Sequence, residues 1–383
     1  MRIHSIRAHP LSVPLAEPLW TAHERLATSS LVLVEVRTVE GATGIGQIHG
    51  APLGEISGWV ERFGELLRGM NALEHVAIRE KLFALTHPRP GGVAGRDGSP
   101  PPLARAARPQ IMAAIGGIDI ALWDLKGKAA GMPVFRLLGG ANRPVFTYAT
   151  GGYYREDGDD DAGVREMAAF AAKGFRGVKL KCCGGPMDAE VDRVRRARAA
   201  IGPDVLLMLD MNAAYTVDDC IRFARGVEPF GIHWLEEPLQ WHLQPADFAV
   251  LARSTIIPLA HGERELTRFT VRDFMLQGGI RFVQFDSTRY GGFTEMLRIA
   301  HLAEQCSVRI APHHAAELHA HLCAAFPDAS FGVESHGDDA RDPLAHGIYR
   351  ARAEVRDSQV WLSEAPGFGI EIDWAFVDRH RQG

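Results

Sequence analysis

The sequence predicts an α/β protein in which a small α+β domain precedes a closed (β/α) barrel. Three observations favour this architecture: the length of the chain, an alternation of strand and helix patterns after Pro144, and three apolar runs that each end in a carboxylate. The 383 residues suit a barrel of roughly 250 residues together with a smaller domain.

The first 125 or so residues have the pattern of an α+β domain without internal repeats. We expect strands at 1–15, 29–40 and 43–48 and helical segments at about 54–85 and 109–130. Residues 88–109 are rich in Pro, Gly and Arg, and we expect them to form a flexible or functional loop.

Eight strand candidates follow, and amphipathic helical patterns such as 188–201 and 293–305 lie between most of them. The strands are expected at 145–149, 177–181, 206–211, 232–236, 257–261, 282–286, 308–312 and 331–334. Eight such units predict a closed parallel barrel with its helices outside. A doubly wound open sheet is the alternative, but polar residues recur at the strand ends along the whole series, whereas an open sheet uses one or two switch points.

Three apolar runs in this series end in acidic residues at nearly equal intervals. They are LMLD at Asp210, HWLEEP at Glu236 and Glu237, and IPLAHGE at Glu263, and the intervals from Asp210 to Glu236 to Glu263 are 26 and 27 residues. A barrel places its chemistry at the C-terminal ends of its strands, where these acids would meet. Three carboxylates predict a hard cation, and Mg²⁺ fits better than Zn²⁺, which prefers His or Cys. The alternative is that each acid caps a helix or pairs with a surface arginine.

Two lysines, Lys179 and Lys181, lie on the same face of the strand predicted at 177–181, because alternate residues of a strand share a face. Their mutual repulsion and a nearby Mg²⁺ would lower the lysine pKa, so that one of them could act as a base. The alternative is a pair of solvated lysines that flank the strand.

Asp286 and Glu334 end the strands predicted at 282–286 and 331–334, His313 follows the one at 308–312, and Asn212 follows the one at 206–211. An aspartate beside His313 can orient its imidazole and raise its basicity, which indicates an acid/base pair. The run HHAAELHAH, from His313 to His321, could also be read as a metal cluster, but it lacks the HExxH spacing of zinc sites.

Composition excludes several classes of partner. The net charge of −5 gives no support for binding to nucleic acid or to an anionic membrane. Five cysteines without a CxxC motif indicate reduced thiols in a cytoplasmic protein. No apolar run approaches 18 residues, and the N-terminus has no continuous signal core. GxxxxGK and GxSxG motifs are absent.

The whole chain resembles the enolase superfamily, and within it the mandelate racemase group. The resemblance rests on a combination of motifs: AAIGGIDIALWDLKGKAAGMPVFRLLGG at 113–140, Lys-x-Lys, LDMN, WLEEP, HGE, and FDSTRYGG followed by APHH. It implies a modified TIM barrel, (β/α)7β, with an α+β N-terminal capping domain, which differs from the eight full units predicted by pattern. The implied domains are residues 1–125 for the cap, completed by the tail 356–383, and residues 126–355 for the barrel.

The resemblance also implies roles for individual residues. Asp210, Glu236 and Glu263 correspond to three Mg²⁺ ligands, and Lys181 to the general base. The other implied roles are substrate contacts for Lys179, Asn212 and Glu334, and an acid/base pair for His313 and Asp286. Trp20, His23 and Arg25 lie between the first two predicted strands, on what we expect to be a loop, and are either surface residues or a cover over the barrel mouth.

The implied chemistry starts with removal of the proton beside a substrate carboxylate, which gives an enediolate stabilised by Mg²⁺ and nearby cations. The stretch APHHAAELHAHLCAAFP resembles the acid-sugar dehydratases of the group, which implies elimination of a β-hydroxyl from an aldonate or aldarate, a small carboxylate substrate. Racemisation or epimerisation and lactone cycloisomerisation are alternatives within the superfamily. A non-catalytic sugar-acid binding protein and a Schiff-base aldolase are alternatives from other classes. Specificity is expected to depend on residues 16–30 and 46–55, and members of the superfamily are commonly homo-oligomers.

Overall fold

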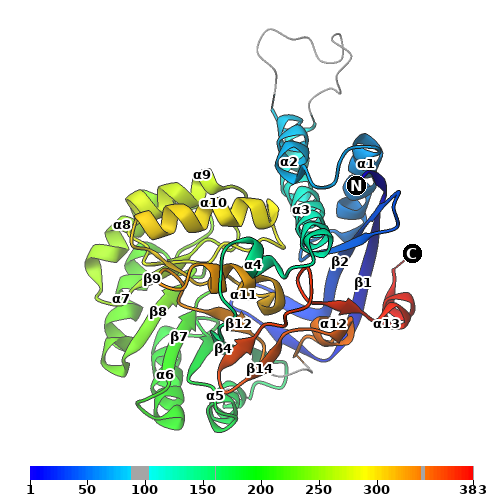
Figure 1. The fold of residues 1–383 in the computed structure, drawn as a ribbon. Helices are drawn as coiled ribbons and strands as arrows, with labels where there is room; N and C mark the ends of the chain where they lie inside the picture. Colours follow the sequence, from blue (N-terminus) through cyan, green and yellow to red (C-terminus); the bar gives the residue numbers. More distant parts are fainter. Residues whose placement is uncertain (88–102, 160, 338–340, 383) are drawn as a thin grey trace.

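The chain begins with an antiparallel sheet in the order β3-β2-β1-β5 (Figure 1). Its strands are β1 (Ile3–Trp20), β2 (Arg25–Thr38), β3 (Thr43–Ile48) and β5 (Tyr154–Arg155). The computed structural model describes residues 1–87, 103–159, 161–337 and 341–382. β1 and β2 are longer than predicted and are separated only by residues 21–24, so the loop expected around Trp20 and Arg25 is instead a tight hairpin.

β2 is buried on both faces, which explains the continuous apolar run in its sequence. Val32 and Val34 pack with the helices α1 and α3, whereas Leu31 and Leu33 pack with α13, because side chains alternate along a strand. The helices of the two layers are α1 (Leu53–Leu67), α2 (His75–Ala84) and α3 (Arg108–Ala130) on one face and α12 (Pro343–Gly347) and α13 (Trp374–His380) on the other. In Figure 1 the C-terminal α13 accordingly lies beside the N-terminal β1.

The helix α3 begins inside the stretch predicted as a loop. Residues 88–102 lie outside the described part of the chain, but a short turn, η1 (Arg105–Ala107), leads directly into α3. The loop prediction was wrong for residues 105–108, because the helix starts one residue before Pro109, which is well suited to the first turn of a helix, where its missing N–H has no partner to lose. α3 then continues past residue 125, the predicted domain boundary, to Ala130.

Eight parallel strands form the barrel. They are β4 (Val145–Gly151), β6 (Gly177–Lys181), β7 (Leu206–Asp210), β8 (Ile232–Glu236), β9 (Leu259–His261), β10 (Phe282–Val283), β11 (Arg309–Ile310) and β12 (Val333–Ser335). Each pairs with its neighbour from β4 to β11, β12 pairs with β4, and a parallel bridge between Ile310 and Ser330 closes the ring. The closed barrel, rather than the open sheet, is confirmed.

Seven helices in the described part of the chain follow barrel strands and pack outside them. They are α5 (Ala162–Ala172), α6 (Met187–Ile201), α7 (Val217–Val227), α8 (Pro245–Ser254), α9 (Arg268–Asp273), α10 (Gly292–Gln305) and α11 (Ala316–Ala325), with single turns at Glu228–Phe230 and Phe274–Gly278. After β12 the chain leaves the barrel, and its next helix, α12, packs on the capping sheet. The architecture is therefore (β/α)7β, and the eighth full unit predicted from the pattern is absent from the described residues.

The interior of the barrel is packed with apolar and aromatic side chains, and its polar groups lie at the C-terminal ends of the strands. Tyr148, Met208, Trp234 and Phe282, from β4, β7, β8 and β10, form a buried cluster inside the ring. This packed floor leaves the C-terminal ends of the strands as the place where polar groups gather.

The C-terminal tail belongs to both parts of the molecule. Its strands are β13 (Tyr349–Ala351), β14 (Glu354–Arg356), β15 (Gln359–Trp361) and β16 (Glu371–Ile372). β15 pairs antiparallel with β4 of the barrel, and the backbone N–H of Val134, at the start of α4 (Val134–Leu137), donates to Gly367. The segment with β16 and α13, together with Tyr349 of β13, packs in the cluster around β1 and β2. Among the described helices, none is both long enough and apolar enough to cross a bilayer.

Candidate active site

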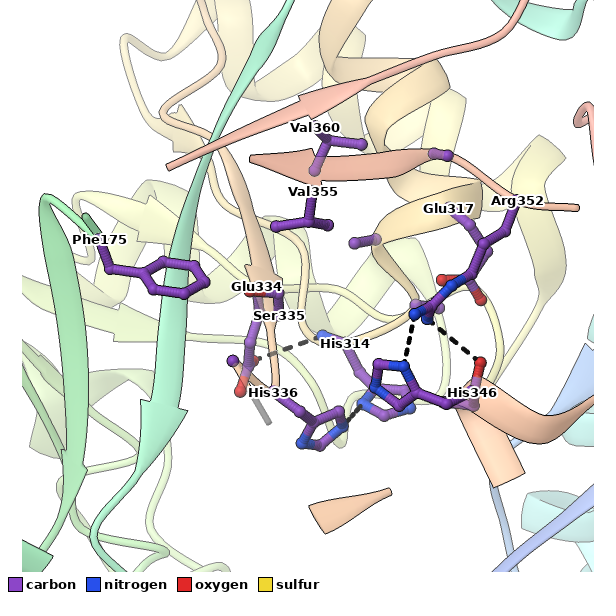
Figure 2. A pocket seen from close by; sticks show the side chains of 15 residues that line it. Phe175, His314, Glu317, Glu334, Ser335, His336, His346, Arg352, Val355 and Val360 are labelled. Atoms are coloured by element: carbon purple, nitrogen blue, oxygen red, sulfur yellow. Dashed lines mark hydrogen bonds between the residues drawn. The ribbon is translucent and has the colours of Figure 1, made fainter. Parts of the chain in front are cut away.

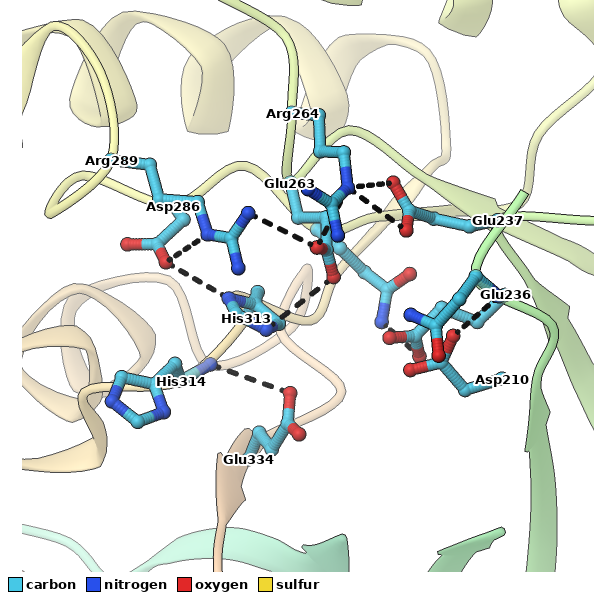
Figure 3. Close-up of polar contacts among 12 residues, drawn as sticks. Asp210, Glu236, Glu237, Glu263, Arg264, Asp286, Arg289, His313, His314 and Glu334 are labelled. Carbon is cyan, nitrogen blue, oxygen red and sulfur yellow. Dashed lines mark hydrogen bonds and ion pairs between the residues drawn. The ribbon is translucent and has the colours of Figure 1, made fainter. Parts of the chain in front are cut away.

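The C-terminal ends of neighbouring barrel strands bring ionisable side chains together; Figure 3 shows the acidic ones. Lys179 and Lys181 lie on β6, Asp210 ends β7, Glu236 ends β8, and Glu263 follows β9. The strand register sets Lys181 opposite Asp210 and Asp210 opposite Glu236. All five side chains belong to residues no more than 5% exposed, so their charges need partners.

The two lysines form ion pairs with the acids. Lys179 Nζ donates to Glu236 and lies 3.3 Å from Asp210 Oδ2 and 3.1 Å from Glu334 Oε1, and Lys181 Nζ donates to Asp210. Burial lowers the pKa of each lysine, but the facing carboxylates outweigh it and raise both pKa values above the ordinary lysine range. The predicted lowering of the lysine pKa values depends on a nearby Mg²⁺ as well as on mutual repulsion; among the protein groups alone, the carboxylates outnumber the ammonium groups and raise both pKa values.

A histidine–aspartate pair, His313 and Asp286, lies beside Glu263 (Figure 3). His313 Nδ1 is 2.9 Å from Asp286 Oδ2, while Thr288 donates to Oδ1 of the same carboxylate from its backbone N–H at 2.8 Å and from its hydroxyl at 2.6 Å. Burial would raise the pKa of Asp286, but the contact with His313 holds it below its usual range. The ionised aspartate orients the ring and leaves His313 Nε2, 3.4 Å from Glu263 Oε2, for proton transfer.

Two arginines that the sequence analysis did not single out lie within ion-pair distance of Glu237 and Glu263. Arg264 Nε lies 3.3 Å from Glu237 and 3.6 Å from Glu263, and an Arg289 nitrogen lies 3.5 Å from Glu263. Burial would raise the pKa of Glu263, but His313 and these arginines hold it at about 2. Arg264 directly follows the HGE motif and Arg289 stands in FDSTRYGG, which was the available signal. Glu237 thus pairs with Arg264 and not with the lysines.

The three predicted ligands suit Mg²⁺ in donor type and lie at successive strand ends. Asp210, Glu236 and Glu263 are buried carboxylates on successive strand ends, and Glu263 Oε2 accepts no hydrogen bond within the described part of the chain. Burial and the neighbouring acids raise the pKa of Glu236, so a cation among these carboxylates is electrostatically favourable. Oxygen donors of this kind are typical of Mg²⁺ sites.

Asn212 and Glu334 border the same region. The backbone N–H of Asn212 donates to Asp210 Oδ1 at 3.1 Å, and the buried side-chain Oδ1 of Asn212 has no hydrogen-bond partner in the described chain. Glu334 contacts Lys179 on one side and accepts from the backbone N–H of His314 at 3.4 Å on the other. Asn212 thus adjoins a predicted metal ligand, and Glu334 adjoins one of the two lysines.

The three residues predicted to cover the barrel mouth occupy the β1–β2 hairpin. Trp20 ends β1 and pairs with Tyr154 in the segment after β4, His23 lies in the turn, and Arg25 begins β2. Arg25 forms an ion pair with Glu156 at 2.7 Å, and its guanidinium lies 5.8 Å from the centre of the Trp20 ring. A substrate contact for these residues stays a prediction.

The other histidines of the HHAAELHAH run have structural partners. His319 lies 2.7 Å from the Ser287 hydroxyl and 2.8 Å from the backbone oxygen of His314. His321 accepts from the backbone N–H of Phe135 at 3.1 Å and lies 3.2 Å from the backbone oxygen of Phe368. These two rings therefore do not converge on one ion.

Comparisons with known proteins agree on one family. The family model described as "Enolase C-terminal domain-like" matches residues 163–376, and that described as "Mandelate racemase / muconate lactonizing enzyme, N-terminal domain" matches residues 99–139. The D-galactarolactone cycloisomerase of Agrobacterium fabrum is 32% identical over 97% of this chain and 97% of its own length. The L-talarate/galactarate dehydratase of Salmonella typhimurium is 30% identical over 97% of this chain and 89% of its own. The arabinonate dehydratase of Saccharolobus solfataricus is 32% identical over 68% of this chain and 70% of its own.

Solved structures give the same answer. A racemase from Streptomyces coelicolor with bound magnesium has a TM-score of 0.86 and 27% identity over 99% of this chain and all of its own. A mutant L-talarate/galactarate dehydratase liganded with Mg and L-glucarate has a TM-score of 0.86 and 27% identity over all of this chain and 92% of its own. With the matched models and the shared architecture, these likenesses show that the chain belongs to the mandelate racemase and muconate lactonizing enzyme group of the enolase superfamily.

Proposed function

We propose that this chain is a Mg²⁺-dependent dehydratase of an acid sugar, an aldonate or aldarate, which yields a 2-keto-3-deoxy acid. The observation that carries the proposal is the arrangement of two proton-transfer groups about one acidic rim: Lys181 at the end of β6, and His313, oriented by Asp286, after β11. A reaction that removes one proton and delivers another to a leaving hydroxyl needs two such groups. The dehydratase names of several relatives support the same reaction.

Asp210, Glu236 and Glu263 would hold Mg²⁺, as the magnesium-containing structures of relatives suggest. When bound, the ion supplies positive charge that stabilises the enediolate formed beside the substrate carboxylate. Lys179, Asn212 and Glu334 would bind and orient that carboxylate, because Glu334 contacts Lys179 and the backbone of His314, and Asn212 adjoins Asp210.

The proposed proton transfers balance as an elimination of water. Lys181, after losing its own proton, accepts the proton from the carbon beside the carboxylate. The bond between the neighbouring carbon and its hydroxyl then breaks, and the hydroxyl takes a proton from His313 Nε2 and leaves as water. Asp286 stabilises the protonated imidazole before that transfer, and the resulting enol tautomerises to the 2-keto acid.

Lactone cycloisomerisation is the second candidate, because relatives that align over 97% and 98% of this chain carry cycloisomerase names. Racemisation or epimerisation also uses proton-transfer groups on two sides of a carbon. These reactions leave the elemental composition of the substrate unchanged, whereas dehydration removes one water, so product mass separates them.

The test is a screen of aldonic acids, aldaric acids and their lactones with Mg²⁺, with products followed by mass spectrometry and by a 2-keto-acid assay. We expect loss of one water and formation of a 2-keto acid from at least one acid, and no product with Lys181→Met or His313→Asn. An isomeric product alone would replace the dehydratase proposal with the cycloisomerase or epimerase reaction. Retention of dehydration by both variants would remove these residues from the mechanism. The cytoplasmic location and the homo-oligomeric state stay predictions.

A further inference from the structure

A second cluster of metal-ligand side chains lies beside the candidate active site. His314 follows β11, His336 follows β12, and Asp342 is the N-cap of α12. One ligand atom from each residue lies within 4.8 Å of the ligand atoms of the other two. Among the described residues, no other group of three or more His, Cys, Asp and Glu side chains meets this condition. Figure 2 shows the His314 and His336 rings turned toward each other.

The three side chains approach one another closely enough to close on one ion. His336 Nε2 lies 2.8 Å from His314 Nδ1 and 3.4 Å from Asp342 Oδ2, and the other ring nitrogen of His314, Nε2, lies 3.6 Å from the same oxygen. Ligand atoms about 2.1 Å from a tetrahedral ion are about 3.4 Å apart, so an ion bound through one nitrogen of His314 replaces the hydrogen bond between the two rings and moves them slightly apart. The side chains of all three are mostly buried, with exposures of 10%, 17% and 10% for His314, His336 and Asp342.

The carboxylate is already oriented for such a role. Asp342 Oδ1 accepts from the hydroxyl of Ser29 in β2 at 2.6 Å and from the backbone N–H of Ala345 at 3.0 Å. Its Oδ2 is thereby left to face the two imidazoles. Hydrogen bonds that fix a ligand in this way are a regular feature of metal sites.

The backbone at His314 is also strained. His314 and Ala315 have φ values of 55° and 44°, in the left-handed region that non-glycine residues rarely adopt. Strain of this kind persists only where contacts with the surrounding structure hold the residue in that conformation. Here it directs the ring of His314 to His336 while the preceding His313 faces Asp286.

We propose that His314, His336 and Asp342 form a second metal site, which takes Zn²⁺ rather than Mg²⁺. Two imidazoles and one carboxylate are typical zinc ligands, whereas Mg²⁺ prefers oxygen donors alone. An adjoining cavity of about 140 Å³, lined in part by His314, Ser335 and His336, has room for a water molecule as the fourth ligand.

Such an ion would connect the barrel to the cap. His314 stands next to the proposed acid/base His313, and Asp342 is hydrogen-bonded to Ser29 of the capping sheet. Zinc would therefore fix the backbone after β11 relative to β2. Its role would be to position the backbone beside His313, without contact to the reacting atoms.

The test uses the full chain, stripped with a chelator, supplied with excess Mg²⁺ and one equivalent of Zn²⁺, and then dialysed for metal analysis. We expect one zinc ion per chain in the wild type and in the control His242→Ala, which removes an exposed histidine elsewhere. His336→Ala and Asp342→Asn should weaken zinc retention at least tenfold. Circular dichroism checks that each variant is folded, and Asp342→Asn preserves the shape of the N-cap if His336→Ala does not fold.

Co²⁺ gives an independent readout, because a four-coordinate ion at this site would show strong visible d–d absorption that His336→Ala removes. Failure of the wild type to retain zinc in the presence of Mg²⁺ would overturn the proposal. It would also be overturned if zinc were lost from Glu236→Gln and kept by His336→Ala. None of these measurements depends on a substrate, so they stand apart from the test of the dehydratase function.

Discussion

Lys181 and Asp210 lie opposite each other in register on β6 and β7, and their side chains form an ion pair closed to solvent. The pair unites two proposed roles, since the lysine is the candidate base and the aspartate a candidate Mg²⁺ ligand. Removing the lysine therefore has two consequences that can be measured separately.

Lys181→Met should abolish dehydration while the variant binds Mg²⁺ at least as tightly as the wild type. The activity is lost with the base, whereas Asp210 is freed from its closer ammonium partner and keeps Lys179 at 3.3 Å. Product assays and titration calorimetry with Mg²⁺ check the two parts. Loss of Mg²⁺ binding together with activity would contradict the separation of roles.

Asp286→Asn should lower kcat/KM by about 10²- to 10⁴-fold, because the amide no longer orients and stabilises a protonated His313. The double variant Asp286→Asn/His313→Asn should be no worse than His313→Asn alone, since the two residues act as one unit. Steady-state kinetics on the substrate found in the screen provides the measurement. Additive losses would mean that Asp286 acts independently of His313.

Glu236→Gln should weaken Mg²⁺ binding at least about tenfold, because it removes one charged oxygen ligand and leaves the others in place. Glu237→Gln is the matched control: the adjacent carboxylate pairs with Arg264, so its loss should change the Mg²⁺ dissociation constant by less than about threefold. Calorimetric titration of both variants decides the matter. Equal effects of the two substitutions would reject the ligand assignment.

His321 should make the fold sensitive to acid. Burial lowers its pKa from 6.5 to about 4, so the native protein holds the ring neutral, between the backbone of Phe135 and of Phe368, while the unfolded chain protonates it near pH 6.5. Its contribution is thus fully present above pH 6.5 and is lost as the pH falls toward 4, by up to roughly 3 kcal/mol. Urea unfolding at pH 7.5 and 4.5 should show a smaller pH-dependent loss of stability for His321→Gln than for the wild type. An identical loss in both proteins would assign the acid sensitivity to other groups.

The positions of the rim residues were predictable because they depend on periodicity alone. Once strands recur every 26 or 27 residues, parallel pairing aligns Asp210, Glu236 and Glu263 at one end of the barrel. The same holds for Lys179 and Lys181, which share a face because they are two residues apart. The direction of their pKa shifts was not predictable, because it depends on distances to carboxylates on other strands.

Features that join distant segments could not be read from the sequence. His314, His336 and Asp342 follow two strands and cap a helix, and no local spacing relates them. Likewise, residues 21–24 form a tight hairpin because β1 pairs with β2 nearly to its end, whereas the sequence pattern predicted a longer loop there. The exit of the chain from the barrel after β12 depends on the second apolar face of β2, which packs with Leu344 of α12.

The most direct test of the proposed reaction is deuterium exchange at the carbon beside the carboxylate, followed by proton NMR in D₂O with Mg²⁺ and the acid found in the screen. With His313→Asn, Lys181 still removes the proton but the hydroxyl has no acid to assist its departure. The account therefore predicts that this variant exchanges that hydrogen for deuterium without forming the 2-keto acid, and that Lys181→Met does neither. Exchange that persists in Lys181→Met and disappears in His313→Asn would contradict it.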